Sequence, residues 1–146
     1  NARIRFTARA LSEFGDIKVE AWGDGKSYAK GNSYTDATSY IFIFGGWKNQ
    51  FHVLARNNEH DTNRLELVIN RDASDPKRLP VIQNKKYEMT IERNDGKTVS
   101  FRVDDQELFR FADPEPLSGE QHDRFGFNNW DTPVCFDDLT ITPLSE

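Results

Sequence analysis

Residues 86–103 read KYEMTIERNDGKTVSFRV, which is two runs of strand length separated by a turn signal. The signal is Asn94-Asp95-Gly96, because Asp-Gly tolerates the positive φ angles that a two-residue hairpin requires. The runs on either side, Lys86–Arg93 and Thr98–Val103, contain no proline, which would remove a ladder hydrogen bond. This stretch therefore predicts an antiparallel β-hairpin.

Short runs of the same kind fill the rest of the chain. Ala2–Ala10 alternates, with Ile4, Phe6 and Ala8 on one face and arginine or threonine on the other, as in a strand with one buried face. Ser39–Phe44 is apolar on both faces, which is typical of a strand in the middle of a sheet. Further strands are expected at Asp16–Trp22, Gln50–Arg56, Arg64–Ile69, Glu107–Phe111, Arg124–Asn128 and Val134–Thr142.

These strands predict one domain over residues 1–146, a length that can bury a core of its own. A helical period is hardly present, and Pro116–His122 is the best candidate for one short helical turn. Long connections at Lys26–Thr38, Asn57–Asn63 and Asn70–Lys85 favour a sandwich over a small barrel. We therefore expect an all-β fold, a two-sheet antiparallel β-sandwich of the jelly-roll type.

Two segments carry a resemblance to a known superfamily. Tyr87–Asp105 is a strand-turn-strand unit, and Arg124–Trp130 followed by Val134–Ile141 is an ending marked by glycine, tryptophan and paired aspartates. Both resemble segments of the concanavalin A-like lectin/glucanase superfamily, which includes laminin G-like domains and the bacterial keto-disaccharide hydrolases. The resemblance implies a concanavalin A-like jelly roll, a scaffold that carries lectins, glycanases and adhesion modules.

Composition limits the classes of partner. A net charge of −5 argues against nucleic acid, which demands a basic surface that neutralises phosphates. Membrane insertion is not expected, because the longest apolar run, Tyr40–Phe44, is only long enough for a strand. The single cysteine, Cys135, excludes an internal disulfide and a thiolate zinc site. The chain starts at Asn1 instead of Met, so we expect a processed or excised form.

The sequence contains no counterpart of the catalytic acids found in glucanases of this superfamily. The resemblance implies a Glu-x-Asp-x-x-Glu pattern in its glucanases, where alternate side chains of one strand point into the same groove. The pairs Asp104-Asp105 and Asp137-Asp138 lie at strand ends instead, where aspartate caps backbone amides. The sequence therefore assigns no catalytic residue and disfavours a retaining glucanase.

Two aromatic clusters at strand ends are candidate ligand sites. In the first, the glycines of Gly45–Asn49 permit a close approach, Trp47 offers a flat ring to a sugar, and Asn49 offers a donor and an acceptor. Trp130 is the centre of the second cluster, which also contains Asn128, Asn129 and Asp131. The alternative is that Gly45-Gly46 is a plain turn and that both indoles cover the edge of the core.

A third candidate is the polar segment Arg56–Asp61, which contains Arg56, Asn57, Glu59 and His60. Such a segment suits a sugar, and its oxygens, including those of Glu59, also suit calcium. Its spacing matches no EF-hand loop, so the identity of a metal stays unknown. The alternative is an ordinary solvated loop.

We prefer a non-catalytic carbohydrate-binding, lectin-like module that recognises an oligo- or polysaccharide. We expect it to act outside the cytoplasm as part of a larger exported bacterial protein. Apart from calcium, which the sequence leaves open, no cofactor is expected. Two alternatives remain: a glycoside-active enzyme of the keto-disaccharide hydrolase type that uses Arg56, Glu59 and His60, and a protein-interaction β-sandwich.

Overall fold

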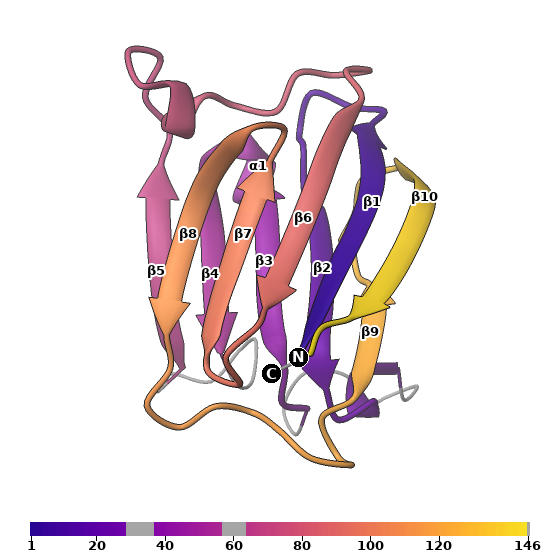
Figure 1. Ribbon diagram of the computed structural model, residues 1–146. Helices are drawn as coiled ribbons and strands as arrows, with labels where there is room; N and C mark the ends of the chain where they lie inside the picture. Colours follow the sequence, from indigo (N-terminus) through magenta and orange to yellow (C-terminus); the bar gives the residue numbers. More distant parts are fainter. Residues whose placement is uncertain (29–36, 57–63, 146) are drawn as a thin grey trace.

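The computed structural model describes residues 1–28, 37–56 and 64–145, which form ten β-strands in two antiparallel sheets (Figure 1). The first sheet has the strand order β10 (Val134–Pro143), β1 (Ala2–Ala10), β6 (Tyr87–Arg93), β7 (Thr98–Val103) and β8 (Gln106–Ala112). The second has the order β5 (Leu65–Asn70), β4 (Phe51–Arg56), β3 (Tyr40–Gly45), β2 (Ile17–Gly23) and β9 (Arg124–Phe127).

The predicted β-sandwich is therefore confirmed, and each described strand lies within two residues of its expected bounds. The hairpin of β6 and β7 pairs Ile91 with Phe101, as the turn at Asp95-Gly96 requires. Three short helical turns are present among the described residues: α1 (Gly46–Asn49), η1 (Lys26–Tyr28) and η2 (Pro76–Arg78). The helical turn expected at Pro116–His122 is wrong, because the chain there makes only a turn closed by His122 N–H and the carbonyl of Gly119, 2.9 Å apart.

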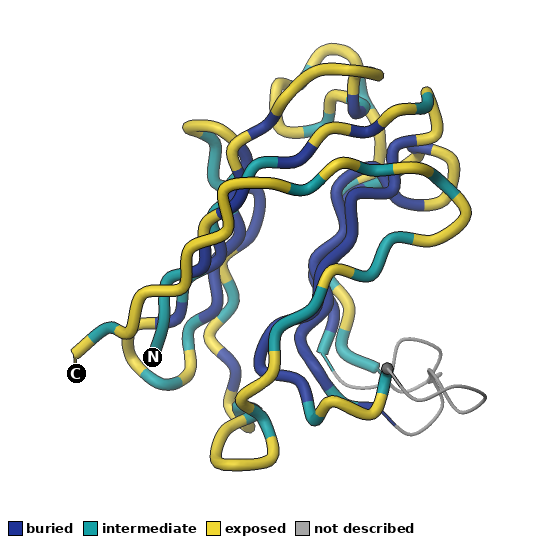
Figure 2. The backbone as a smooth tube through the Cα atoms, turned by 90° about the vertical axis from the view of Figure 1, so that its right-hand side faces the viewer, coloured by how far each residue is buried: buried dark blue, intermediate teal, exposed yellow. Residues whose placement is uncertain are grey.

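The core lies between the two sheets, where the inner sides of both layers are buried (Figure 2). The alternating residues of β1 point into it, and Ile4 and Phe6 are each 3% exposed. Across the layers the rings of Phe42 on β3 and Phe101 on β7 meet edge to face, with centroids 5.5 Å apart. Burial of such side chains supplies most of the stabilisation of a fold of this size.

The outer face of the second sheet is unusual because it is buried as well. Ile41 and Ile43 on β3 pack with Val53 and Ala55 on β4 in a second apolar cluster. On the neighbouring β2, the same face carries side chains that are charged and yet buried, those of Lys18 and Glu20. A two-sided strand was predicted for β3, but buried charges on β2 were not.

The edge formed by β9 and β10 is where this sandwich narrows. The strand β9 has four residues and lies opposite β10, which is the edge strand of the other sheet (Figure 1). The ring of Phe127 on β9 stacks on that of Phe136 on β10, with centroids 4.1 Å apart and planes inclined by 20°. Phe127 is still 40% exposed, so the short strand leaves part of this edge uncovered.

Candidate functional site

The structure brings the two tryptophan clusters together. Trp47 follows β3 and Trp130 follows β9, 83 positions later in the chain, yet their rings are parallel within 5° with centroids 6.3 Å apart. This spacing lies in the range of offset-stacked aromatic pairs. Trp47 is 66% exposed and Trp130 is 58% exposed, so neither ring covers the core. We refer to Trp47 and Trp130 as the indole pair.

Trp47 is presented by a left-handed turn. Gly45 has φ 77°, and Trp47, Lys48 and Asn49 also have positive φ angles between 48° and 63°. Positive φ costs energy for any residue with a Cβ atom, so other contacts must fix this turn. At Gly45 a Cβ atom would lie only 2.4 Å from the side chain of Val81, so the position requires glycine.

Asn49 supplies the contacts that fix the turn. Its Nδ2 donates to the carbonyls of Glu13, at 3.0 Å, and of Val81, at 2.8 Å, while its Oδ1 accepts from Val81 N–H at 2.8 Å. The residue is 5% exposed. The amide is thus committed to backbone groups, which gives Asn49 a positioning role in place of the predicted contact with a ligand.

Asp16 connects the two indoles. Its N–H donates to the carbonyl of Gly45 at 2.8 Å, on the turn that carries Trp47. Its carboxylate accepts from the backbone N–H of Trp130 at 2.7 Å. Three connections of the chain therefore meet at one end of the sandwich, β1 to β2, β3 to β4 and β9 to β10 (Figure 1).

The polar members of the second cluster lie beside Trp130. Asn129 donates to the carbonyl of Thr132 at 2.5 Å, which closes the connection from β9 to β10. Asp131 is exposed and has φ 52°. Asn128 points away along β9, where its Nδ2 donates to the carboxylate of Glu20 at 2.5 Å. Of the predicted cluster, Asn129 and Asp131 therefore lie next to Trp130 in the chain, whereas Asn128 contacts Glu20 on β2.

Arg56 belongs to a buried network and not to an open site. Its Nη1 donates to Asp113 at 2.9 Å and to the carbonyl of Glu115 at 2.7 Å, and the Asp113 side chain is fully buried. The hydroxyl of Tyr40 donates to the same carboxylate at 2.6 Å. Burial and this carboxylate raise the pKa of Tyr40. The network gives Arg56 a structural role, and its predicted contact with a ligand stays a prediction.

The remaining members of the third cluster, Asn57, Glu59 and His60, lie outside the described residues. The question of calcium at this segment is therefore not answered by the structure. Among residues 1–28, 37–56 and 64–145, no three His, Cys, Asp or Glu side chains are grouped as metal ligands. The described helices are also too short and polar to cross a membrane.

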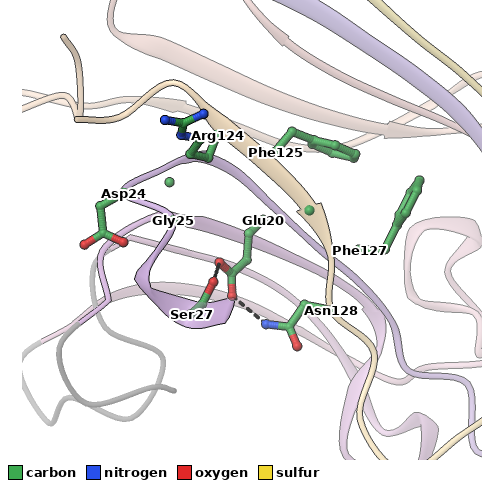
Figure 3. A pocket seen from close by; sticks show the side chains of 10 residues that line it. Glu20, Asp24, Gly25, Ser27, Arg124, Phe125, Phe127 and Asn128 are labelled. Atoms are coloured by element: carbon green, nitrogen blue, oxygen red, sulfur yellow. Dashed lines mark hydrogen bonds between the residues drawn. The ribbon is translucent and has the colours of Figure 1, made fainter. Parts of the chain in front are cut away.

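A cavity of about 580 Å³ opens beside β2 and β9, next to Asn128 (Figure 3). Glu20 is only 7% exposed, and its carboxylate accepts from Ser27 Oγ at 2.8 Å and from Asn128 Nδ2. Arg124 and Asp24 also line this cavity, on either side of Gly25 in Figure 3. We call this feature the β2–β9 cavity; it is lined by Glu20, Gly23, Asp24, Gly25, Ser27, Arg124, Phe125, Gly126, Phe127 and Asn128.

Comparison with known families gives a match over most of the chain. Residues 5–137 match the family described as "Farnesoic acid 0-methyl transferase". The chain belongs to this family. No curated protein matches the sequence. The family description names an activity, and the fold comparisons below bear on architecture alone.

Two solved structures share the architecture of this family member. Sheep galectin-11, in a complex with glycerol, superposes with a TM-score of 0.59 at 11% identity over 96% of this chain and 88% of the galectin. The binding domain of botulinum neurotoxin DC, in a complex with SialylT, gives a TM-score of 0.52 at 19% identity. That match covers 97% of this chain and 31% of the toxin chain. The expected jelly-roll β-sandwich is confirmed.

Sequence reasoning missed two buried acids, Asp16 directly before β2 and Glu20 within it. The sequence predicts only a strand at Asp16–Trp22, because alternation alone cannot tell a covered outer face from a solvated one. The sequence does contain one indication of this site, which is Gly126. A glycine inside a strand often marks a position where a ligand or another backbone segment approaches closely.

Proposed function

We propose that this chain is a non-catalytic carbohydrate-binding module in which a sugar packs on the indole pair. The observation that carries the proposal is the parallel arrangement of two exposed tryptophans from distant loops. An exposed aromatic surface of this kind in a folded protein is typical of a binding site. The sugar-binding role assigned to Trp47 and Trp130 from the sequence is retained here as part of the proposal.

The chemistry of an indole suits the C–H face of a pyranose ring, because its flat apolar surface buries area without demanding a hydrogen bond. The hydroxyl groups at the edge of the sugar require polar partners. Asn129 and Asp131 flank Trp130 and supply amide and carboxylate groups there. Asn49 and Arg56 are left out of the proposed contact, because the amide of Asn49 is bonded to backbone groups and Nη1 of Arg56 is bonded to the buried Asp113.

The comparisons with solved structures support the scaffold on which this proposal depends. A galectin bound to glycerol and a toxin binding domain bound to SialylT use the same class of sandwich. Identities of 11% and 19% carry no site residues from either protein, so the indole pair has to be judged on its own geometry. We further propose that the module works outside the cytoplasm as part of a larger exported bacterial protein, which localisation of the full-length product would test.

A glycan array with the purified chain tests the proposal. We expect binding that falls by tenfold or more in Trp47→Ala and in Trp130→Ala, because a buried aromatic anchor contributes roughly 2 kcal/mol to an interface. Val68→Ala is the matched control, since Val68 is also an exposed apolar residue, 43% exposed, but lies on β5 at the opposite edge of the sheet. Folded protein that binds no glycan would refute the proposal.

The family description provides a rival outcome. If the purified chain methylates farnesoic acid when a sulfonium methyl donor is supplied, the protein is an enzyme and the proposal of a non-catalytic module is wrong. Turnover of a glycoside or keto-glycoside would favour the hydrolase alternative in the same way. Binding of sugar without turnover of any of these substrates is the result that we expect.

A further inference from the structure

The β2–β9 cavity has no part in the site proposed above, although it contains a carboxylate held in an unusual setting. Burial of a charged carboxylate costs free energy unless donors compensate it. Glu20 is 7% exposed and has two donors, Ser27 Oγ and Asn128 Nδ2. These fix its orientation, but a carboxylate accepts about four hydrogen bonds, so further acceptor capacity remains beside the open cavity.

The wall of this cavity is shaped by Gly126. It stands opposite Glu20 in the pairing of β2 with β9, and a Cβ atom added to it would meet no atom within 4 Å. Its φ angle lies outside the left-handed region, so the backbone does not require glycine there. Because Gly126 has no side chain, the cavity stays open next to the Glu20 carboxylate. The backbone conformation of β9 would allow another residue at this position.

The cavity also offers an apolar surface. Phe127 and Phe125 line it from the other side of β9, as Figure 3 shows, and Phe127 is 40% exposed. Their rings pack against Phe6 on the inner face of the sheet, whereas Glu20 projects from the outer face, so the aromatic edge and the carboxylate border the cavity from opposite sides of β9. Asp24 adds little to the recognition, because its carboxylate accepts from the backbone N–H groups of Lys26 and Thr38.

The cavity and the indole pair adjoin each other along the chain. Asn128 lines the cavity and Trp130 is two residues further on, so their Cα atoms can be no more than about 7 Å apart. Asp16, whose carboxylate accepts from the backbone N–H of Trp130, comes directly before β2, the strand that carries Glu20. A ligand that lies on the indoles can thus continue into the cavity.

We propose that the β2–β9 cavity is a second subsite for the next sugar of a bound oligosaccharide, with Glu20 accepting hydrogen bonds from its hydroxyl groups. This rests on the proposed function, and it narrows the substrate class to chains of sugars without a carboxylate at this position. A uronic or sialic acid would bring its own negative charge to Glu20 at the short distances where like charges repel. Single sugars are expected to use the indole pair alone.

Substitution at Gly126 tests the subsite with little risk to the fold. Gly126→Leu places a side chain in the open cavity, and Gly126→Ala is the graded control that adds one methyl group. Glycine inside a strand weakens that strand, and both changes remove it. The two variants should therefore be at least as stable as the wild type. Glu20→Gln provides an independent variant that preserves size and removes the charge.

The probes are cello-, malto- and chito-oligosaccharides of one to six units, together with the strongest glycan of the array and its shortened forms. For the wild type we expect affinity to rise at least tenfold when the chain grows beyond one sugar. In Gly126→Leu this gain should vanish while single-sugar affinity stays within twofold, and Glu20→Gln should reduce the same gain. Gly126→Ala should retain most of it.

The outcomes separate this inference from the proposed function. If the wild type binds glycans but Gly126→Leu shows the full gain with chain length, the subsite is wrong and the indole site stands. If no glycan binds, both are wrong. An NMR titration of the wild type needs no variant: the amide signals of Gly126 and Asn128 should shift with the oligosaccharide and stay unshifted with the single sugar, and unshifted signals in both titrations would overturn the subsite.

Discussion

Mild acid should destabilise this protein through one buried histidine. His52 on β4 is 3% exposed, and its ring stacks on Phe44 with centroids 4.5 Å apart. Gly45 N–H donates to Nδ1 at 3.0 Å, so the neutral ring carries its proton on Nε2, which donates to the carbonyl of Leu79 at 3.1 Å. Burial lowers the pKa of His52 from 6.5 to about 4, although the bond to Leu79 acts in the opposite direction.

The direction and size of the effect follow from proton binding. In the unfolded chain His52 takes up a proton as the pH falls through 6.5, whereas the folded state does so only near pH 4. Its contribution to stability is therefore complete above pH 6.5 and is lost as the pH falls towards 4. At about 1.4 kcal/mol per pKa unit, the full loss is about 3 kcal/mol, of which about 2 kcal/mol is gone at pH 5.

Urea unfolding at pH 7 and pH 5 measures this loss. The reference is His52→Gln, whose amide can accept from Gly45 and donate to Leu79 without titrating. We expect the wild type to lose about 2 kcal/mol more than this variant over the interval. The carboxyl of Asp95, whose pKa is lowered to about 2 by bonds from Thr98, titrates below the interval in both proteins. Equal losses in wild type and variant would refute the reasoning.

Three further changes have definite expected outcomes. Gly45→Ala should lower the free energy of unfolding by roughly 2–4 kcal/mol, because the new methyl group clashes with Val81 and the residue has a positive φ. Gly96→Ala, with φ 76° and open space around it, should lose only the backbone contribution of about 1 kcal/mol, and thermal or urea unfolding of both variants measures the difference. Arg56→Leu should lower stability by about 3–5 kcal/mol in urea unfolding, because it leaves the fully buried carboxyl group of Asp113 without its guanidinium partner, and a loss below about 1 kcal/mol would contradict the structural role of the pair. Asp16→Gly retains the positive φ but removes the carboxylate, so the circular-dichroism couplet of the parallel indole pair should weaken, and an unchanged couplet would contradict the bridging role.

The strands were predictable because their information is local. In β1 the alternation of Ile4, Phe6 and Ala8 with polar residues has one solution, a strand with one buried face. The turn at Asp95-Gly96 likewise sets the β6–β7 hairpin without help from the rest of the fold. Each of these elements is determined by residues within a few positions of each other, and the structure reproduces them.

The site was only half predictable, because its contacts are long-range. Each tryptophan was noticed at a strand end, but nothing in either loop says that Trp47 and Trp130 become neighbours. That depends on Asp16, which bonds to both loops from a third. Asn49 and Arg56 have side chains suited to ligands, yet in the folded protein Asn49 bonds to the backbone of Val81 and Arg56 bonds to the carboxylate of Asp113. Residue type alone cannot decide between these uses.

The backbone at Trp47 gives the strongest reason to regard the indole pair as functional. A left-handed residue with a Cβ atom costs roughly 1 kcal/mol more than glycine would, and Trp47, Lys48 and Asn49 adopt this conformation in succession. Asn49 recovers part of that cost through its three hydrogen bonds, whereas the ring of Trp47 is 66% exposed and recovers little through burial. The fold alone would be served better by glycine at that position. A tryptophan held there against its backbone preference, parallel to a second exposed tryptophan, is the feature on which the proposed binding role rests.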